Sequence, residues 1–253
     1  MLTFHFDRPI TLCHGSGDGK TSACWMTAIS LYANKNWGDH PECVAPTIQS
    51  FARPTNDNMT DEARGRLIGP HLFAPIGTAR FDPTTGQYFE PIDIAERRAL
   101  ISLRFAYQDA WPTILEVFET SELSSLAIEM RAVVLERRAD CDKFEPLLRR
   151  VVSHLPAPSA SYAAAYAAYA APSAAYAATA AASAATASAA YAAAPFASRA
   201  SSTDPLAPRL MEAREAVFAR SVQCVLEMCK VDCSAPIGPD LSGIERVRRV
   251  CAR

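Results

Sequence analysis

The sequence predicts a mainly α-helical protein with a short extended (β) N-terminus and a long helix of alanine and tyrosine. Apolar residues recur at helical spacing along most of the chain, and alternation typical of strands is confined to its beginning. Of the 44 residues from Ala157 to Ala200, 26 are alanine, the best helix former. With 253 residues, 49% hydrophobic and 21% charged, the chain can bury a full core, which excludes collagen, general disorder and a disulfide-only miniprotein.

Charge divides the chain into three regions. The net charge is only -2, so no strong field draws the protein onto nucleic acid or an anionic membrane, and we expect neither as a partner. No Asp, Glu, Lys or Arg occurs from Val151 to Ser198. We therefore predict an N-terminal mainly helical domain (1–155), an alanine-rich helical segment (156–203) and C-terminal helices (204–253).

The N-terminus is expected to be extended. Residues 2–6 and 10–12 are predicted to form two short strands, and residues 14–19 a glycine-rich loop. Thr21 or Ser22 can cap a following helix that ends near Asn34. Its apolar face consists of Trp25, Ala28, Ile29 and Tyr32.

Three further helix starts follow from capping residues. Thr60, with acidic residues in the next turn, begins a helix that Gly69 and Pro70 stop. A capping-box pattern of Asp and Glu at positions 93 and 96 begins the next, and Pro112 lets the chain restart as another helical segment. Ser124 or Ser125 is expected to open the helix after that.

The strongest helix signal begins at residue 144. Its apolar residues follow i, i+3, i+4, i+7, i+8 and i+11 without a miss, which predicts a buried face. They are Phe144, Leu147, Leu148, Val151, Val152 and Leu155. The last region repeats the pattern with Leu210, Val217, Ser221 and Val225, and then with a short helix over residues 242–251.

The alanine-rich segment carries five tyrosines, Tyr162, Tyr166, Tyr169, Tyr176 and Tyr191. On one helix at about 100° per residue they fall within about 80° of each other. This stripe favours a long packed helix, kinked at Pro172, over a disordered tether or a transmembrane span.

The glycine-rich loop nearly matches a phosphate-binding loop. Residues 14–21 read HGSGDGKT, and only the first glycine of G-x-x-x-x-G-K-[ST] is replaced, by His14. A helical chain lacks the parallel sheet that such enzymes use, so a glycine loop feeding a helix N-terminus is the simpler interpretation.

Cys24 is the candidate nucleophile. Near a helix N-terminus and Lys20, its thiol pKa would fall, and Ala23-Cys24-Trp25 resembles the end of the papain-like C-G-[SA]-C-[WY] signature. Asp39 and His40 would supply the base and its carboxylate. The rest of that signature is missing, and a small buried cysteine on a helix is the structural alternative.

Metal binding is not expected. His40-x-x-Cys43 has zinc-like spacing, but the sequence contains no second pair at a fixed distance. With no export signal at residues 1–8, we expect a cytoplasmic protein whose eight cysteines are free thiols. No cofactor is expected.

Two segments resemble a family of uncharacterised bacteriophage and actinobacterial proteins. Cys24-Trp-Met, the stretch from Trp37 to Pro46 (WGDHPECVAP) and Asn56-Asp57 match its Cys-x-Met, Trp-x-Asp-His-Pro-x-Cys and Asn-Asp motifs, and its members have an alanine-rich tail. Thr27 replaces the family's usual Glu. The resemblance implies phage or bacterial origin and a bacterial cytoplasm, and nothing about chemistry. Separately, we take Lys20 of the glycine-rich segment, together with Trp37, Asn56 and Asp57, as candidate binding residues.

The same residues have structural interpretations. Pro41 forces His40 out of the helical region, and Asn56-Asp57 is expected in a loop before Thr60 as an Asx turn. We therefore expect a helical protein that binds another protein, or itself, through the alanine–tyrosine helix. The alternative is a cysteine-dependent hydrolase or transferase, which requires Cys24 and His40 to lie close together in one folded unit of residues 13–57.

Overall fold

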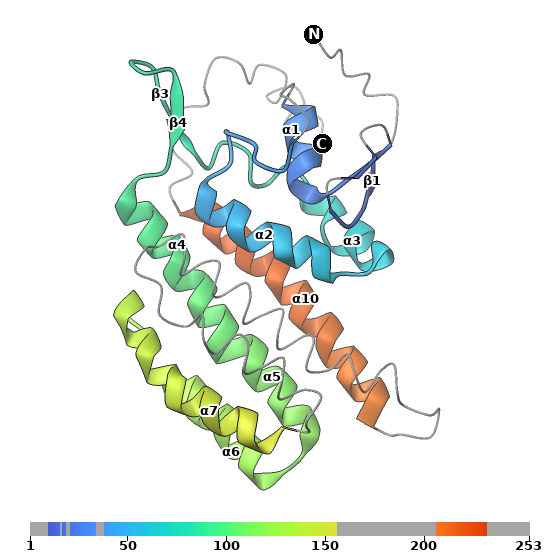
Figure 1. Ribbon diagram of the computed structural model, residues 1–253, viewed down its shortest axis with the longest axis vertical. Helices are drawn as coiled ribbons and strands as arrows, with labels where there is room; N and C mark the ends of the chain where they lie inside the picture. The colour runs from blue at the N-terminus through green and yellow to red at the C-terminus, as the bar shows by residue number, and fades with distance from the viewer. Residues whose placement is uncertain (1–9, 16, 19–20, 34–37, 156–205, 232–253) are drawn as a thin grey trace.

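The computed structural model describes residues 10–15, 17–18, 21–33, 38–155 and 206–231 (Figure 1). The strand expected at 2–6, the alanine–tyrosine segment, the helix expected at 242–251, and the candidate residues Lys20 and Trp37 lie outside this part of the chain.

The protein is mainly helical, as the sequence predicts, with two short two-stranded sheets in the described part. The strands are β1 (Thr11–Leu12), β2 (Ser22–Ala23), β3 (Arg80–Asp82) and β4 (Gln87–Phe89). The α-helices are α1 (Trp25–Tyr32), α2 (Pro46–Asn58), α3 (Asp61–Leu67), α4 (Ile92–Arg104), α5 (Trp111–Leu115), α6 (Ser121–Ala132), α7 (Glu145–His154) and α10 (Leu206–Lys230). Short 3-10 segments are Gly69–His71, Glu116–Phe118 and Arg138–Phe144. No described helix is long and apolar enough to cross a membrane.

The N-terminal sheet precedes α1. β1 and β2 pair in parallel, with Thr11 beside Ser22 and Leu12 beside Ala23. Because Ser22 is used in β2, it cannot cap the helix; α1 begins at Trp25 and its N-cap is Cys24. The predicted cap at Thr21 or Ser22 was therefore wrong.

Helix α2 was missed by the sequence analysis, which placed residues 56 and 57 in a loop. It begins at Pro46, whose fixed φ suits the first turn and whose missing N–H is not needed there. Pro54 lies inside it, and Asn56 and Asp57 form its last turn. The Asx-turn interpretation was wrong. The following helix α3 begins as predicted, with the Thr60 hydroxyl accepting from the N–H of Ala63 at 3.2 Å.

A continuous helical path runs from Ile92 to Phe118. α4 has no side-chain cap, since its N-cap is Pro91, so the capping box expected at Asp93 is not formed. Residues Phe105–Ala110 form a π-helical turn before α5. Pro112 offers no N–H and its ring would crowd the carbonyl four residues earlier, and the wider π turn accommodates it. The chain thus continues at Pro112 through α5.

The helices that follow α5 in the chain cover α4 and α5 on two sides (Figure 1). α6 begins at Ser121 with Thr120 as its N-cap, one turn before the predicted Ser124 or Ser125. α7 presents Phe144, Leu147, Leu148, Val151 and Leu155 to the core, which confirms the predicted buried face.

Helix α10, which follows the alanine-rich segment in the sequence, completes the core. It packs on α2, α3, α4 and α5, and Leu210, Val217, Ser221 and Val225 are buried as predicted. Residues of α1, α2, α4–α7 and α10 belong to one hydrophobic cluster. Regions that flank the alanine-rich segment in sequence therefore share a single core.

A buried ion pair joins three of these helices. The Arg98 guanidinium of α4 donates to Glu90 at 2.8 Å, and both side chains are at least 95% buried. Arg98 also donates to the carbonyls of Met228 and Val231 at the end of α10, while Glu90 accepts from the N–H of Thr47 in the first turn of α2. Arg98 is thus a C-cap for α10 and Glu90 an N-terminal anion for α2.

Candidate functional site

The Cys24 sulfur caps helix α1. It accepts from the N–H of Thr27 at 3.3 Å and shares a hydrogen bond with the Thr27 hydroxyl at 3.1 Å. The residue is only 4% exposed. Burial raises the pKa of the Cys24 thiol; the hydrogen bonds from Thr27 act in the opposite direction, and the charge of Asp57 adds to the rise. Cys24 is therefore held as a neutral thiol, not as an activated thiolate.

Asn56 joins the end of the β1–β2 ladder. Its side-chain oxygen accepts from the N–H of Trp25 at 3.2 Å, and its amide nitrogen donates to the carbonyl of Cys13 at 3.0 Å. In a parallel ladder those two backbone groups would be the next to bond to each other. The Asn56 amide is inserted between them, and the residue is fully buried. This explains why an amide, with one donor and one acceptor side, suits the position.

Asp57 fixes the glycine-rich loop. One carboxylate oxygen accepts from the N–H of Gly15 and from the Asn56 amide, both at 3.0 Å. Asp18 of the loop accepts from the N–H groups of Thr21 and Ser22, which follow the loop, each at 2.8 Å. These amides, which a phosphate would require, are bound to the protein's own carboxylates. The loop also leads into β2, whereas a phosphate-binding loop leads directly into a helix.

His40 and Asp39 belong to a second polar cluster, beside the first half of α2. The two ring nitrogens of His40 lie 3.2 Å from Gln49 Oε1 and 2.8 Å from Arg53 Nη1, and Asp39 pairs with Arg53 at 3.2 Å. The Gln49 amide also donates to the carbonyls of Pro41 and Val44. The His40 side chain is 65% exposed. Gln49 thus holds the Asp-His-Pro turn that the sequence singled out.

The structure brings the predicted site residues together only in part. Cys24, Asn56 and Asp57 meet where β1, α1 and the last turn of α2 converge. His40 and Asp39 contact Gln49 and Arg53 instead, and none of the polar contacts of Cys24 described above involves His40. These contacts therefore include no base beside the Cys24 thiol.

His40 and Cys43, which have zinc-like spacing in the sequence, differ in their surroundings. Cys43 is fully buried, and its carbonyl accepts from the N–H groups of Gly77 and Ala79. Within the described ranges, no group of three or more His, Cys, Asp or Glu residues is arranged to hold a metal ion.

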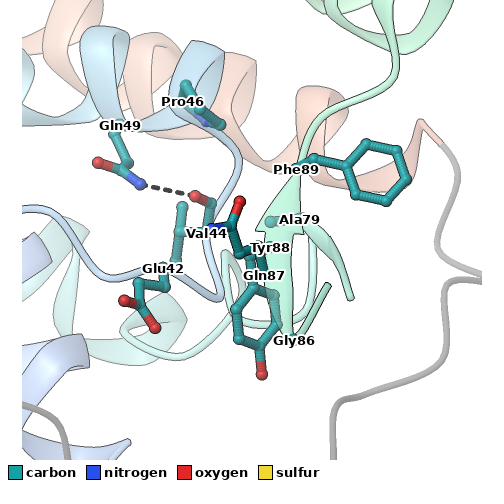
Figure 2. A pocket seen from close by; sticks show the side chains of 9 residues that line it. All are labelled: Glu42, Val44, Pro46, Gln49, Ala79, Gly86, Gln87, Tyr88 and Phe89. Atoms are coloured by element: carbon teal, nitrogen blue, oxygen red, sulfur yellow. Dashed lines mark hydrogen bonds between the residues drawn. The ribbon is translucent and has the colours of Figure 1, made fainter. Parts of the chain in front are cut away.

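A groove that the sequence analysis missed lies between the start of α2 and strand β4 (Figure 2). It has a volume of about 320 Å³ and is lined by Glu42, Val44, Pro46, Gln49, Ala79, Gly86, Gln87, Tyr88 and Phe89. Figure 2 shows the Gln49 amide bonded to the Val44 carbonyl in its wall, and the Phe89 ring turned away from the other lining side chains. The hairpin signal, Asp82-Pro-Thr-Thr-Gly86 between two aromatic strands, was present in the sequence.

Comparison with protein families, with curated proteins and with solved structures found no match to this chain. The roles of the site residues therefore follow from their contacts. Through those contacts, Cys24, Asn56 and Asp57 connect the N-terminal sheet, α1 and α2.

Proposed function

We propose that this protein works by protein binding, with a second copy of itself as the partner and the alanine–tyrosine segment 156–203 as the contacting element. The observation that carries the proposal is the set of five tyrosines at helical spacing in a stretch without Asp, Glu, Lys or Arg. Small alanines permit close approach of a second helix, and tyrosine gives a large, rigid contact area with a polar end.

The described residues that flank the segment support this proposal. Leu155, the last described residue before the segment, is buried, and so is Leu210 in the first turns of α10. Both belong to the same hydrophobic cluster. The described residues on either side of the segment are therefore fixed in one packed core.

The alternative, a cysteine-dependent hydrolase or transferase using Cys24, receives less support. Its nucleophile is buried with a raised pKa, and its sulfur is engaged by Thr27. We expect a thiol probe at mildly acidic pH to alkylate Cys24 slowly in the folded protein. A single fast-reacting thiol at this position would favour the enzyme over the binding protein.

The setting of this activity is also a proposal. We infer from the motif resemblance that the protein is phage or bacterial in type and acts in the cytoplasm, without a cofactor and without binding nucleic acid or membrane. The near-balance of charge supports the last point.

The proposal is tested by sedimentation equilibrium of the full chain over a wide concentration range. We expect reversible self-association, and its loss when Tyr162, Tyr166, Tyr169, Tyr176 and Tyr191 are all replaced by Ser. A matched control replaces five residues of the same segment that lie outside this set, Ser159, Ser173, Thr179, Ser183 and Thr186, by Ala, and should associate as the wild type does. A wild type that stays monomeric, or equal association of both variants, would refute the proposal.

A further inference from the structure

Cys13 and Cys24 directly follow the two strands of the N-terminal sheet. The parallel register pairs Thr11 with Ser22 and Leu12 with Ala23, and Cys13 and Cys24 are the residues that directly follow these pairs. The N–H of Cys13 still bonds to the carbonyl of Ala23 at 3.0 Å. Neighbouring strands lie about 4.8 Å apart, and disulfides span about 4.4–6.8 Å between Cα atoms. The backbone therefore holds these cysteines within reach of a disulfide.

The surroundings keep the pair in this position. Asn56 binds the carbonyl of Cys13 with one end of its amide and the N–H of Trp25, next to Cys24, with the other. Both cysteines are free thiols in the structure. The Cys24 sulfur is hydrogen-bonded to Thr27, so a bond to Cys13 requires these contacts to break.

We propose that Cys13 and Cys24 are an oxidative modification site, which a small disulfide oxidant of the glutathione class converts into an intrachain disulfide. The Cys13 thiolate attacks one sulfur of the oxidant, forming a mixed disulfide and releasing one glutathione thiolate. The Cys24 thiolate then attacks the Cys13 sulfur and displaces the second glutathione. The protein thiols lose two protons and two electrons, and the oxidant is reduced to two thiols.

The exposure of the two residues sets the order of these steps. Cys13 is partly exposed, so a dissolved oxidant can reach it, whereas Cys24 is almost fully buried. Burial raises the pKa of Cys24, which makes it a poor first nucleophile. Once glutathione is on Cys13, the second step is intramolecular and proximity compensates for the small thiolate fraction.

The resulting bond closes a loop that contains the glycine-rich segment and ties β1 covalently to the start of α1. It also removes the sulfur that caps this helix from its Thr27 contacts. Oxidation would thus exchange a hydrogen-bonded junction, held by Asn56 and Asp57, for a covalent one.

The test uses the full chain, reduced and then incubated with oxidised glutathione at mildly alkaline pH. The protein is then denatured in the presence of N-ethylmaleimide, which blocks the remaining thiols, and is digested with trypsin for mass spectrometry. Cleavage after Lys20 and Lys35 separates the two cysteines. We expect the peptide ending at Lys20 and the peptide 21–35 to be joined by a disulfide that accounts for most of Cys13. Cys43, fully buried, is the internal control and should carry the blocking group.

Two variants distinguish the steps. In Cys24→Ser, whose hydroxyl can still cap α1, Cys13 should retain glutathione; in Cys13→Ser, no linked peptide should form. Circular dichroism confirms that each variant is folded. Wild-type protein that keeps glutathione on Cys13, that leaves Cys13 unreacted, or that links Cys13 to another cysteine would overturn the proposal.

Discussion

The roles of Cys24 and Asn56 are defined by the backbone groups to which their side chains hydrogen-bond. Cys24 and Asn56 stood out in the sequence as candidate site residues, and the structure gives each a backbone partner at the same junction. The sequence could mark them as special, Cys24 by its place near a helix N-terminus and both by the motifs that contain them. It could not reveal their roles, because the partners of Asn56 lie 31 and 43 residues away in the chain.

At this scale we predict that Asn56→Ala destabilises the protein by roughly 2–4 kcal/mol. The change leaves the N–H of Trp25 and the carbonyl of Cys13 without their partner, and each buried unsatisfied group costs roughly 1–3 kcal/mol. Urea unfolding measures the difference.

Asn58→Ala is the matched control. Asn58 lies two residues further along the same helix and donates to one carbonyl, that of Pro54, from a partly exposed position. Its loss should cost roughly 1 kcal/mol or less. Equal destabilisation by the two variants would show that Asn56 is an ordinary helix residue.

At the scale of elements, hydrophobic periodicity succeeded where helices are amphipathic and uninterrupted. α7 and α10 were found from their apolar faces, and α3 from the Thr60 cap. α2 was missed because prolines lie at its start and inside it, and neither residue signals a helix by itself. The three-residue strands β3 and β4 are too short to establish an alternating pattern.

Leu148 tests the buried face of α7. We expect Leu148→Ala to cost roughly 2–5 kcal/mol, because the residue is 5% exposed and its truncation leaves a cavity in the core. Ile128→Ala on α6 is the control, since Ile128 is 66% exposed and should change the unfolding free energy by less than about 0.5 kcal/mol. A loss at Leu148 as small as at Ile128 would contradict the described packing.

Asp140 is expected to make the stability of the Arg138–Phe144 segment depend on pH. Its hydrogen bond from Lys143, with help from the N–H groups of Arg137 and Glu136, lowers its pKa from 3.8 to about 2. The stabilisation is present above the unfolded pKa and is lost as the pH falls through the folded one. We therefore expect Asp140→Asn to lower the Tm at neutral pH, and this Tm difference to shrink between about pH 4 and pH 2. A Tm difference independent of pH over that window would argue against it.

At the scale of the molecule, the sequence divides into three regions, whereas its first and last described parts share one core. The composition change after residue 150 was evident, but the contact of α10 with α2 and α4 depends on pairing across more than 100 residues. No local pattern encodes such a contact. Arg98, an unremarkable charge in an amphipathic helix, proves to be the residue that connects the three helices.

We predict that Arg98→Met destabilises the protein by about 3–5 kcal/mol, because Glu90 is left buried without its cation. Hydrogen exchange should show the loss first at the end of α10, whose carbonyls Arg98 caps.

Arg97→Met, at the exposed neighbouring position, is the control and should cost less than about 0.5 kcal/mol. The double variant Glu90→Gln with Arg98→Met should recover part of the loss, since the uncompensated charge is removed. Independent, additive effects of the two changes would argue against the buried pair.

The position of α10 in the chain also governs how the protein is made. A ribosome adds about 5–20 residues per second, so the 50 residues 156–205 separate the synthesis of α7 from that of α10 by several seconds. During this interval the faces of α2, α4 and α5 that α10 will cover remain open to water. The nascent chain thus presents a ready target for chaperones until its last described helix emerges and closes the core.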